Sequence, residues 1–386
     1  MVTSTIARRR WSAVAAVILA AVLVVPALGQ APAPAPNSPA PVFPGTDWQR
    51  IPKPEAVGFS TARLAALRGW LASIDTTSMF VTVGGRVLFE YGDITHLSYL
   101  ASVRKSVLAM LYGKYVENGT ITLGTTLKDL QFTDVGGLLP RELEATVEDL
   151  ITARSGVYHP ASNAGDSTDS APPRGSQAPG AYYLYNNWDF NAAGAVFEKL
   201  TGRDIYDAVD TDLARPIGMQ DFDRQAQRKS GDPTRSQHMA YHMHFSVRDM
   251  ARIGLLMSRD GSWNKQQVVP RAWAQRIRSL VTPMNEMNPP GYRALGSGQR
   301  WGYGCMWWVW DAPNSPGPFA GAYTGMGAGG QFITILPEFD MVVAHKTDTS
   351  QVSPHGPGQR RRSVSGRDYD AILRLLISSR PAYAVR

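Results

Sequence analysis

The stretch that most constrains the fold of this chain is residues 99–110, where small and polar residues give way to an apolar run. This pattern predicts the start of a buried helix, with Ser102 in its first turn and Lys105 three residues later. Residues three apart share a helix face, so the Ser102 hydroxyl and the Lys105 amine can meet. A lysine whose pKa is lowered by burial can take the proton of a serine hydroxyl and make it a nucleophile. The N–H groups at the helix start are suited to stabilise an oxyanion.

The Ser-x-x-Lys pattern is unspecific on its own, because the chain contains it a second time. Ser262 and Lys265 follow Asp260-Gly261, which is a turn signal, so no helix is expected to start there. The context therefore favours Ser102 as the candidate nucleophile. A catalytic serine and an ordinary serine both remain compatible with the pattern itself.

The N-terminal residues 1–29 have the features of a signal peptide. Three arginines at 8–10 precede an apolar stretch at 11–25, and the small residues at 27–29 suit a cleavage site. An uncleaved membrane anchor is the alternative, since the apolar segment is just long enough for one. Residues 30–47 are rich in proline and alanine and are expected to form an extended linker.

Charge and cysteine content exclude some classes of protein. Loss of residues 1–29, which carry three Arg and no acid, lowers the net charge from +7 to +4. That value is too small to indicate a nucleic-acid partner. The single cysteine, Cys305, permits no internal disulfide, so an exported chain depends on packing alone.

The order of the predicted elements indicates one folded domain over residues 48–386. A helix and a β-hairpin around Gly84-Gly85 come first, followed by a mostly helical segment over about 116–290 that a long loop at 155–180 interrupts. Strands and a final helix are expected at 301–310, 321–336, 341–345 and 368–379. This order predicts an α/β (α+β) fold, with an antiparallel sheet made from both chain ends, flanking helices and an inserted, mostly helical subdomain.

Two further segments carry residues that suit catalysis. In the Tyr-rich segment 182–191, the Tyr185 hydroxyl can shuttle a proton, and the Asn187 amide can bind an ammonium or a carbonyl. In the glycine-rich segment 321–331, Gly327 permits a close backbone approach, and the Ala328 amide is a candidate second oxyanion donor. The alternatives are aromatic packing for the first segment and an ordinary flexible turn for the second.

Taken in order, these three segments resemble those of the penicillin-recognising serine enzymes, the superfamily of serine β-lactamases, D-Ala-D-Ala peptidases and related esterases and amidases. Ser102 and Lys105 match the Ser-x-x-Lys motif, and Tyr185 and Asn187 match the Tyr-x-Asn motif of the class C branch. Residues 187–194 and 245–254 also resemble family segments, and the resemblance covers residues 55–380. It implies a β-lactamase/DD-peptidase-like fold and catalysis by Ser102, Lys105 and Tyr185.

The third motif of the family departs from the Lys-Thr-Gly pattern. Lys346-Thr347-Asp348 is the nearest match, but we expect it to follow the last strand, whereas two strands should follow the motif. Gly327–Gln331 fits the position better and is similar to the 6-aminohexanoate-dimer hydrolase branch. The resemblance then implies that a lysine for holding a β-lactam or peptide carboxylate is missing. It also implies that Tyr158 contacts the scissile amide, although packing in its loop is the alternative.

Other arrangements of catalytic or metal-binding residues fit the sequence less well. The cluster His238, His242 and His244 lacks a further cysteine or acid to complete a zinc site, so no metal is expected. No Gly-x-Ser-x-Gly segment surrounds Ser102, which argues against a Ser-His-Asp triad. The segment 301–310, with its tryptophans, is expected to be a core strand that can also form one wall of a pocket.

The sequence therefore predicts an exported, periplasmic or secreted serine hydrolase that acts on a small ester or amide. It predicts no metal, no cofactor, no nucleic-acid partner and no stable membrane contact after signal cleavage. A β-lactamase or D-Ala-D-Ala carboxypeptidase is one alternative, and a non-catalytic cell-envelope binding protein with the same fold is another. The sequence makes no prediction of the oligomeric state.

Overall fold

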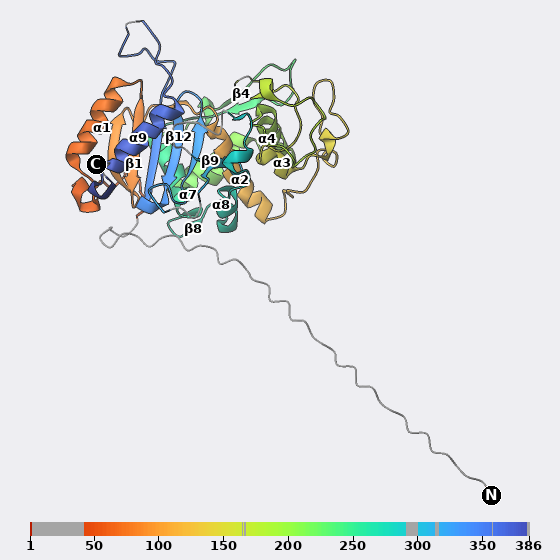
Figure 1. Ribbon diagram of the computed structural model, residues 1–386, viewed down its shortest axis with the longest axis horizontal. Helices are drawn as coiled ribbons and strands as arrows, with labels where there is room; N and C mark the ends of the chain where they lie inside the picture. Colours follow the sequence, from red (N-terminus) through yellow and green to blue (C-terminus); the bar gives the residue numbers. More distant parts are fainter. Residues whose placement is uncertain are drawn as a thin grey trace. The chain divides into compact units, whose positions relative to one another are not determined.

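The computed structural model (Figure 1) describes Met1 and residues 42–163, 165, 167–290, 300–312, 316–356 and 358–383. The chain divides into two units, residues 1–32 and 33–386, and all the described helices and strands belong to the second unit. The expected signal peptide, apart from Met1, and residues 30–41 of the expected linker lie outside the described residues. Within the described part of the chain, no helix combines the length and the apolar character needed to cross a membrane.

The centre of the fold is an antiparallel sheet whose seven described strands have the order β2-β1-β13-β12-β11-β10-β9. Two strands come from the N-terminal part and five from the C-terminal part of the described domain. Their bounds are β1 (Ser78–Val83), β2 (Arg86–Gly92), β9 (Trp301–Tyr303), β10 (Trp308–Trp310), β11 (Tyr323–Gly327), β12 (Gln331–Leu336) and β13 (Met341–Lys346). The predicted sheet made from both chain ends is confirmed.

Local sequence explains the strands on either side of the first turn. Gly84 and Gly85 both have positive φ, at 59° and 78°, as the two-residue turn between β1 and β2 requires. Every residue of β1, β12 and β13 is buried, because helices cover both faces of the sheet there. Each fully buried Val, Ile, Leu or Met side chain contributes about 1.5–3 kcal/mol of hydrophobic stabilisation.

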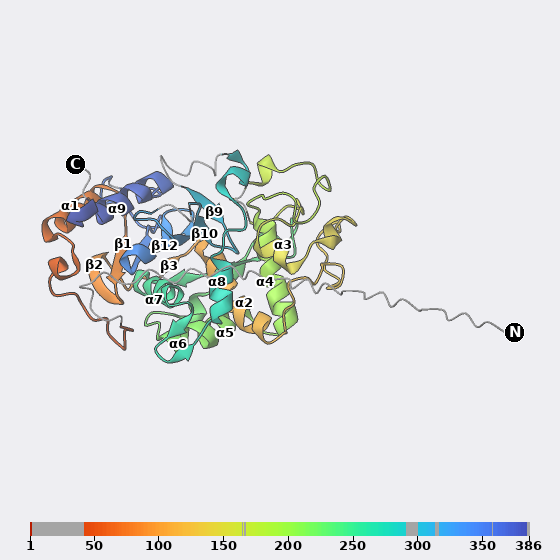
Figure 2. The ribbon, with the colours of Figure 1, turned by 60° about the horizontal axis from the view of Figure 1, so that its bottom comes forward.

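Helices pack on both faces of the sheet, as Figures 1 and 2 show together. On one face α1 (Thr61–Ser73) packs against α9 (Gly366–Ser378), and on the other α7 (Val247–Ser258) packs on β13, β12 and β1. Ser60 caps α1 by accepting from the Arg63 amide, and Ser365 forms a capping box with Asp368 at the start of α9. These caps set where both helices begin.

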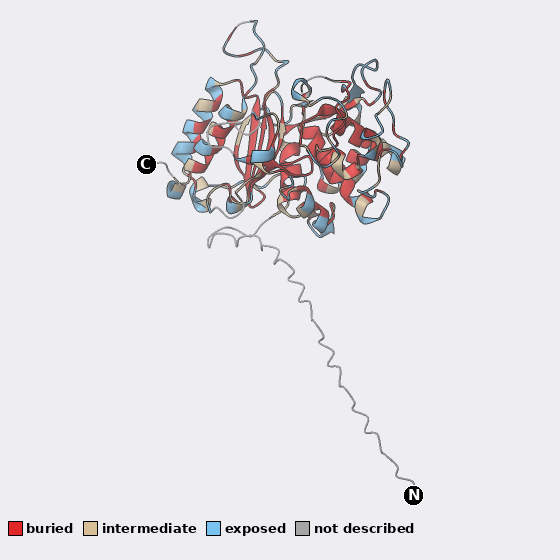
Figure 3. Ribbon diagram, turned by 45° about the vertical axis from the view of Figure 1, so that its right-hand side comes forward, coloured by how far each residue is buried: buried red, intermediate tan, exposed pale blue. Residues whose placement is uncertain are grey.

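Between β3 and β9 the chain forms a second group of helices beside the sheet. The helix α2 packs against α8, α4 and β11, and α3 packs against α4. Figure 3 shows these helices and the strands largely buried, whereas α1 and α9 expose their outer faces. The bounds are α2 (Val103–Glu117), α3 (Val147–Ile151), α4 (Asn187–Thr201), α5 (Ile205–Ala208), α6 (Arg215–Ile217) and α8 (Arg271–Ile277).

Six short strands among the described residues lie outside the main sheet and form three antiparallel pairs. The pair β3 (Ser98–Tyr99) and β6 (His244–Phe245) lies directly before α2 and α7 in the sequence. The others are β4 (Arg228–Ser230), β5 (Ala240–His242), β7 (Ser262–Trp263) and β8 (Gln266–Gln267). Although α7 belongs to residues 116–290, it packs on the main sheet, so that segment contributes to both parts of the domain.

Candidate active site

Ser102 occupies a tight turn between β3 and α2. Ala101 has a left-handed φ of 48°, and Ser102 follows with φ −75° and ψ −9° immediately before the helix. A left-handed residue other than glycine costs about 1–3 kcal/mol and persists where the surroundings hold it. The Leu100 amide donates to the Met243 carbonyl at 2.9 Å, which fixes one side of the turn. The half-buried Ser102 side chain thus lies at the N-terminus of the buried helix α2.

Lys105 connects the first two predicted motifs. Its Nζ lies 3.0 Å from Ser102 Oγ, 2.8 Å from the Tyr185 hydroxyl and 2.7 Å from Asn187 Oδ1. The side chain is 1% exposed, because α2 is buried on almost all sides. When Lys105 is protonated, its three N–H donors match the three oxygen atoms around the amine. When Lys105 is neutral, its lone pair can accept the proton of the Ser102 hydroxyl, 3.0 Å away. The geometry therefore suits proton transfer between Ser102 and Lys105.

Tyr185 and Asn187 reach Lys105 because of how α4 begins. Asn186 caps the helix by accepting from the Trp188 amide at 2.9 Å, which places Asn187 in the first turn and Tyr185 just ahead of it. The capping geometry turns both side chains toward α2. The structure thus brings Ser102, Lys105, Tyr185 and Asn187 into one group of contacts.

Three aromatic side chains that were not predicted as site residues, those of Phe190, Tyr303 and Trp308, complete this group. The rings of Phe190 and Tyr185 each have their centroid 4.2 Å from Lys105 Nζ. Tyr303 and Trp308, from β9 and β10, pack against the Tyr185 ring at 6.1 and 5.8 Å. Phe190 lies three residues after Asn187, so helical spacing would have placed it on the same face. The expectation of one core strand over 301–310 is wrong, because the segment turns back on itself as the antiparallel pair β9 and β10, and this pair supplies a wall beside Tyr185.

Gly327 brings the end of β11 against the Ser102 turn. A Cβ atom at Gly327 would lie 2.5 Å from the Leu100 carbonyl oxygen and 3.1 Å from the Ser102 nitrogen, so a side chain does not fit. Gly327 pairs with Gln331 in the hairpin of β11 and β12, and the exposed Ala328 follows it in the turn. The backbone of Gly327 is therefore next to the Ser102 amide, and Ala328 lies one residue farther along.

Replacing Gly327 by Ala is expected to lower kcat for an ester substrate by about 10–100-fold, because a displacement of about 1 Å in a catalytic group has an effect of that order. The added methyl group forces β11 and the Ser102 turn apart. Steady-state kinetics on the purified variant measures the loss. Gly124→Ala is the control, since no atom lies within 4 Å of the added methyl group. Equal activity of Gly327→Ala and wild type would show that this contact does not matter.

Tyr158 lies in the predicted loop, which holds one described short helix, a 3-10 turn at Thr168–Ser170. Its side chain is 8% exposed, and its hydroxyl has no hydrogen-bond partner among the described residues. Burial, and then the charge of Asp189, raise the pKa of the Tyr158 hydroxyl, so it stays protonated and keeps a free donor. Asn186 Nδ2 donates to the carbonyl of the neighbouring Val157 at 2.7 Å. This bond holds the loop against the start of α4, and among the described residues the Tyr158 hydroxyl makes no hydrogen bond to Ser102.

Lys346 does not lie where the sequence predicted, because it belongs to the last described strand and does not follow it. The last strand, β13, extends through Lys346, so the expectation that this residue follows the strand is wrong. Its amine is buried and donates to the carbonyls of Ser98 and Phe245 at 2.7 and 2.6 Å, which keeps the residue in the extended strand. Burial lowers the pKa of Lys346 to about 7. Two strands, β12 and β13, follow the glycine-rich segment, as we expected of the third motif.

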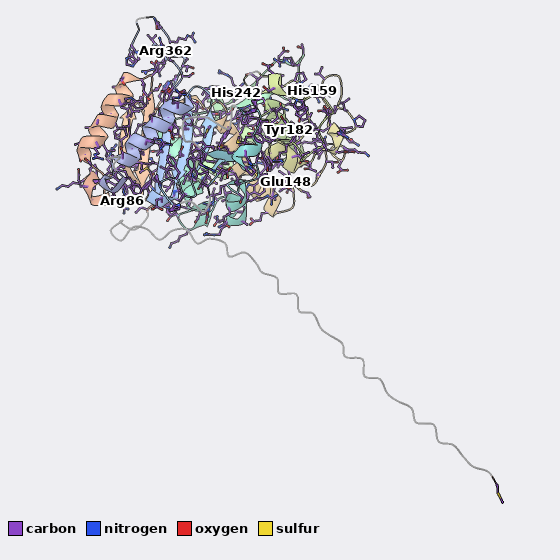
Figure 4. All side chains as sticks on the ribbon, viewed as in Figure 1. Arg86, Glu148, His159, Tyr182, His242 and Arg362 are labelled. Carbon is purple, nitrogen blue, oxygen red and sulfur yellow. The ribbon has the colours of Figure 1, made fainter. Side chains whose placement is uncertain are left out.

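The three histidines considered as a zinc site do not share one position. Figure 4 labels one of them, His242. His238 Nε2 faces the Thr133 carbonyl at 2.9 Å, whereas His242 and His244 pack around the Tyr99 ring. Among the described residues, no group of three or more His, Cys, Asp or Glu side chains is placed to hold a metal ion.

The second Ser-x-x-Lys pattern does not start a helix. Ser262 belongs to the short strand β7, which pairs with β8 through the turn that contains Lys265. Its predicted lack of a helical context is confirmed. Only the pattern at Ser102 has its lysine one helical turn away on the same face.

Comparison with known proteins identifies the family. The family model described as Beta-lactamase matches residues 68–362, which is most of the chain. No curated protein sequence matches the chain significantly.

Solved structures share the fold at low sequence identity. A Bacillus anthracis protein provisionally described as a 6-aminohexanoate-dimer hydrolase has a TM-score of 0.57 and 19% identity, over 82% of this chain and 84% of that one. A Mycobacterium bovis β-lactamase has a TM-score of 0.55 and 18% identity, over 84% and 100% of the two chains. EstCE1, described as a hydrolase with promiscuous acyltransferase activity, has a TM-score of 0.54 and 15% identity, over 75% and 93%.

The family match and the shared fold agree with the order of motifs along the chain. The fold places the first two motifs in contact, and the third beside the Ser102 turn. The chain therefore belongs to the Beta-lactamase family, within the superfamily of penicillin-recognising serine hydrolases.

Proposed function

We propose that this protein hydrolyses a small ester or amide through an acyl-enzyme formed on Ser102. The observation that carries the proposal is the position of Lys105, whose amine lies within hydrogen-bond distance of Ser102, Tyr185 and Asn187 at once. A nucleophile, a base and a proton carrier in mutual contact are the parts that acyl transfer needs.

In this mechanism Ser102 Oγ attacks the carbonyl carbon of the substrate while its proton passes to neutral Lys105. The amides of Ser102 and Ala328 hold the oxyanion, which the contact between Gly327 and the Ser102 turn supports. Tyr185 then carries a proton to the leaving group, and its 2.8 Å contact with Lys105 supports this relay. Asn187 positions the amine and the substrate. Water releases the acyl group and restores Ser102.

The composition of β11 supports a neutral substrate. Its residues 323–327 carry no lysine, and the side chain of Lys346 is engaged with backbone carbonyls. Without a cation at the third motif, a β-lactam or peptide carboxylate lacks its usual partner. The solved structures of the same fold include proteins described as β-lactamases and as other hydrolases, so β-lactamase or D-Ala-D-Ala carboxypeptidase activity is the second candidate. A binding protein without catalysis is less well supported, because the catalytic positions are filled and in contact.

A substrate panel distinguishes the two enzymatic candidates. We expect kcat/KM for a short-chain nitrophenyl ester or an aminohexanoate dimer to exceed that for nitrocefin, because the anionic lactam finds no lysine on β11. The measurement is steady-state hydrolysis of all three compounds by the mature protein. A clear preference for nitrocefin would establish the lactamase candidate in place of the esterase or amidase. Turnover of none of them would favour the binding protein.

We also propose that the protein is exported to the periplasm or secreted, on the signal-peptide pattern of residues 1–29. The mature chain is expected to begin between Gln30 and Ala35. Sequencing the N-terminus of protein isolated from its native cell envelope or medium checks this. Recovery of Met1 or Val2 would indicate an uncleaved anchor.

A further inference from the structure

The buried Lys346 side chain contacts the backbone of β3, the strand that precedes Ser102. Its amine, at the end of β13, donates to the carbonyls of Ser98 on β3 and Phe245 on β6. Those two residues are partners in the antiparallel pair β3 and β6, so one amine spans both members of the pair. Lys346 is 0% exposed, and water is therefore not available to replace it as the donor.

The segment that Lys346 holds is short and conformationally demanding. Ser98 is four residues before Ser102, and between them Ala101 adopts its left-handed φ of 48°. The Leu100 amide is bound by the Met243 carbonyl, and the Leu100 carbonyl lies against Gly327. The contact of Lys346 with Ser98 is thus one of three that hold residues 98–101, and the three come from separate segments of the chain: the end of β13, Met243 between β5 and β6, and the end of β11. Backbone strain of this kind lasts only where several contacts determine it.

We propose that Lys346 is a positioning residue, which aligns Ser102 by holding the carbonyls of Ser98 and Phe245. The inference rests on the proposed function, since it assigns a role to a residue that does not contact the substrate. An amine keeps two N–H donors even when neutral, so both carbonyls remain bound in either protonation state. This gives a role to the Lys-Thr-Asp segment, which does not occupy the position of the third motif.

Substitution of Lys346 by Met tests the proposal, because Met has a similar length and no donor. The expected result is a loss of kcat of about 10–100-fold, as for other small displacements of a catalytic group, with KM little changed. The rate at which a fluorophosphonate labels Ser102 should fall by the same factor. Both rates are normalised to folded protein, determined by circular dichroism.

Arg252→Met is the matched control. Arg252 is also 0% exposed and also donates to backbone carbonyls, at 2.8 Å to those of Ile217 and Gly45 and at 3.5 Å to that of Pro44. This variant should lose thermal stability yet keep the kcat and labelling rate of the wild type. If Lys346→Met behaved in the same way, with reduced stability and unchanged kcat, its role would be structural only and the proposal would be wrong.

A second substitution covers a failure of Lys346→Met to fold. Lys346→Gln keeps N–H donors, but its amide nitrogen is one bond closer to the backbone than the lysine amine and is not expected to reach both carbonyls, so its kcat should lie below the wild-type value. Wild-type kcat in Lys346→Gln would overturn the proposal. If instead the wild-type protein hydrolyses no ester and its Ser102 takes no label, the proposed function fails, and this inference fails with it.

Discussion

Replacing Ser102 by Ala is expected to lower kcat/KM for a nitrophenyl ester by about 10⁴–10⁶-fold, the scale seen when the nucleophile of a serine hydrolase is removed. The reason is geometric, since Ser102 Oγ is the hydroxyl that Lys105 Nζ reaches, at 3.0 Å. The substitution removes only one oxygen atom from a half-buried side chain. Thermal unfolding should therefore stay close to that of the wild type. Steady-state kinetics and circular dichroism on the same preparation measure both quantities.

Ser262→Ala is the matched control, because Ser262 belongs to the other Ser-x-x-Lys pattern and lies in β7. It should keep wild-type activity, and a fluorophosphonate should label Ser102 in this variant as in the wild type. Full activity in Ser102→Ala, or a label on Ser262, would contradict the assignment of the nucleophile.

Replacing Tyr185 by Phe is expected to lower kcat by about 10²–10⁴-fold, the usual contribution of general acid–base catalysis. The substitution keeps the ring and its packing against Phe190, Tyr303 and Trp308, but removes the hydroxyl that lies 2.8 Å from Lys105 Nζ. An amine leaving group needs a proton more than an activated phenolate does. The loss should therefore be larger for an amide than for a nitrophenyl ester with the same acyl group.

Lys105→Met extends the same experiment to the base. It should impair ester and amide hydrolysis at least as strongly as Tyr185→Phe, because it removes the acceptor of the Ser102 proton. Lys199→Met, an exposed lysine on α4, is the control and should be fully active. Near-normal rates of Tyr185→Phe on both substrates would show that Tyr185 only packs, and that the proton takes another route.

Much of the fold was predictable because its signals are local. The Gly84-Gly85 turn between two apolar runs indicates a hairpin, and the amphipathic pattern of 247–257 indicates the helix α7. Tertiary placement is not local, however. The position of α7 on the main sheet depends on which apolar faces meet after folding, and the local pattern does not contain that information.

In the candidate active site too, local contacts could be predicted from the sequence, whereas contacts between distant segments could not. Ser102 and Lys105 are separated by one helical turn, so their contact could be predicted from spacing. Their contact with Tyr185 and Asn187, some 80 residues away, could be expected only from the resemblance to a family.

The role proposed for Lys346 could not be predicted from the sequence. Its partners Ser98 and Phe245 are remote in the chain, and a lysine at the end of a strand is not expected to be fully buried. In the sequence, this lysine is notable only because Lys346-Thr347-Asp348 is the nearest match to the Lys-Thr-Gly motif, and it does not occupy the position of that motif. Its contacts became visible only once β3, β6 and β13 were placed together.

The central claim is that catalysis passes through an acyl group on Ser102, and trapping that intermediate tests it most directly. A nitrophenyl ester is mixed with the protein, the reaction is quenched in acid within the first turnover, and the tryptic peptide 87–104 is analysed by tandem mass spectrometry. The account predicts that this peptide gains the mass of one acyl group, located on Ser102, and that Ser102→Ala gains none. Hydrolysis without an acylated peptide, or an acyl group on any other residue, would contradict it.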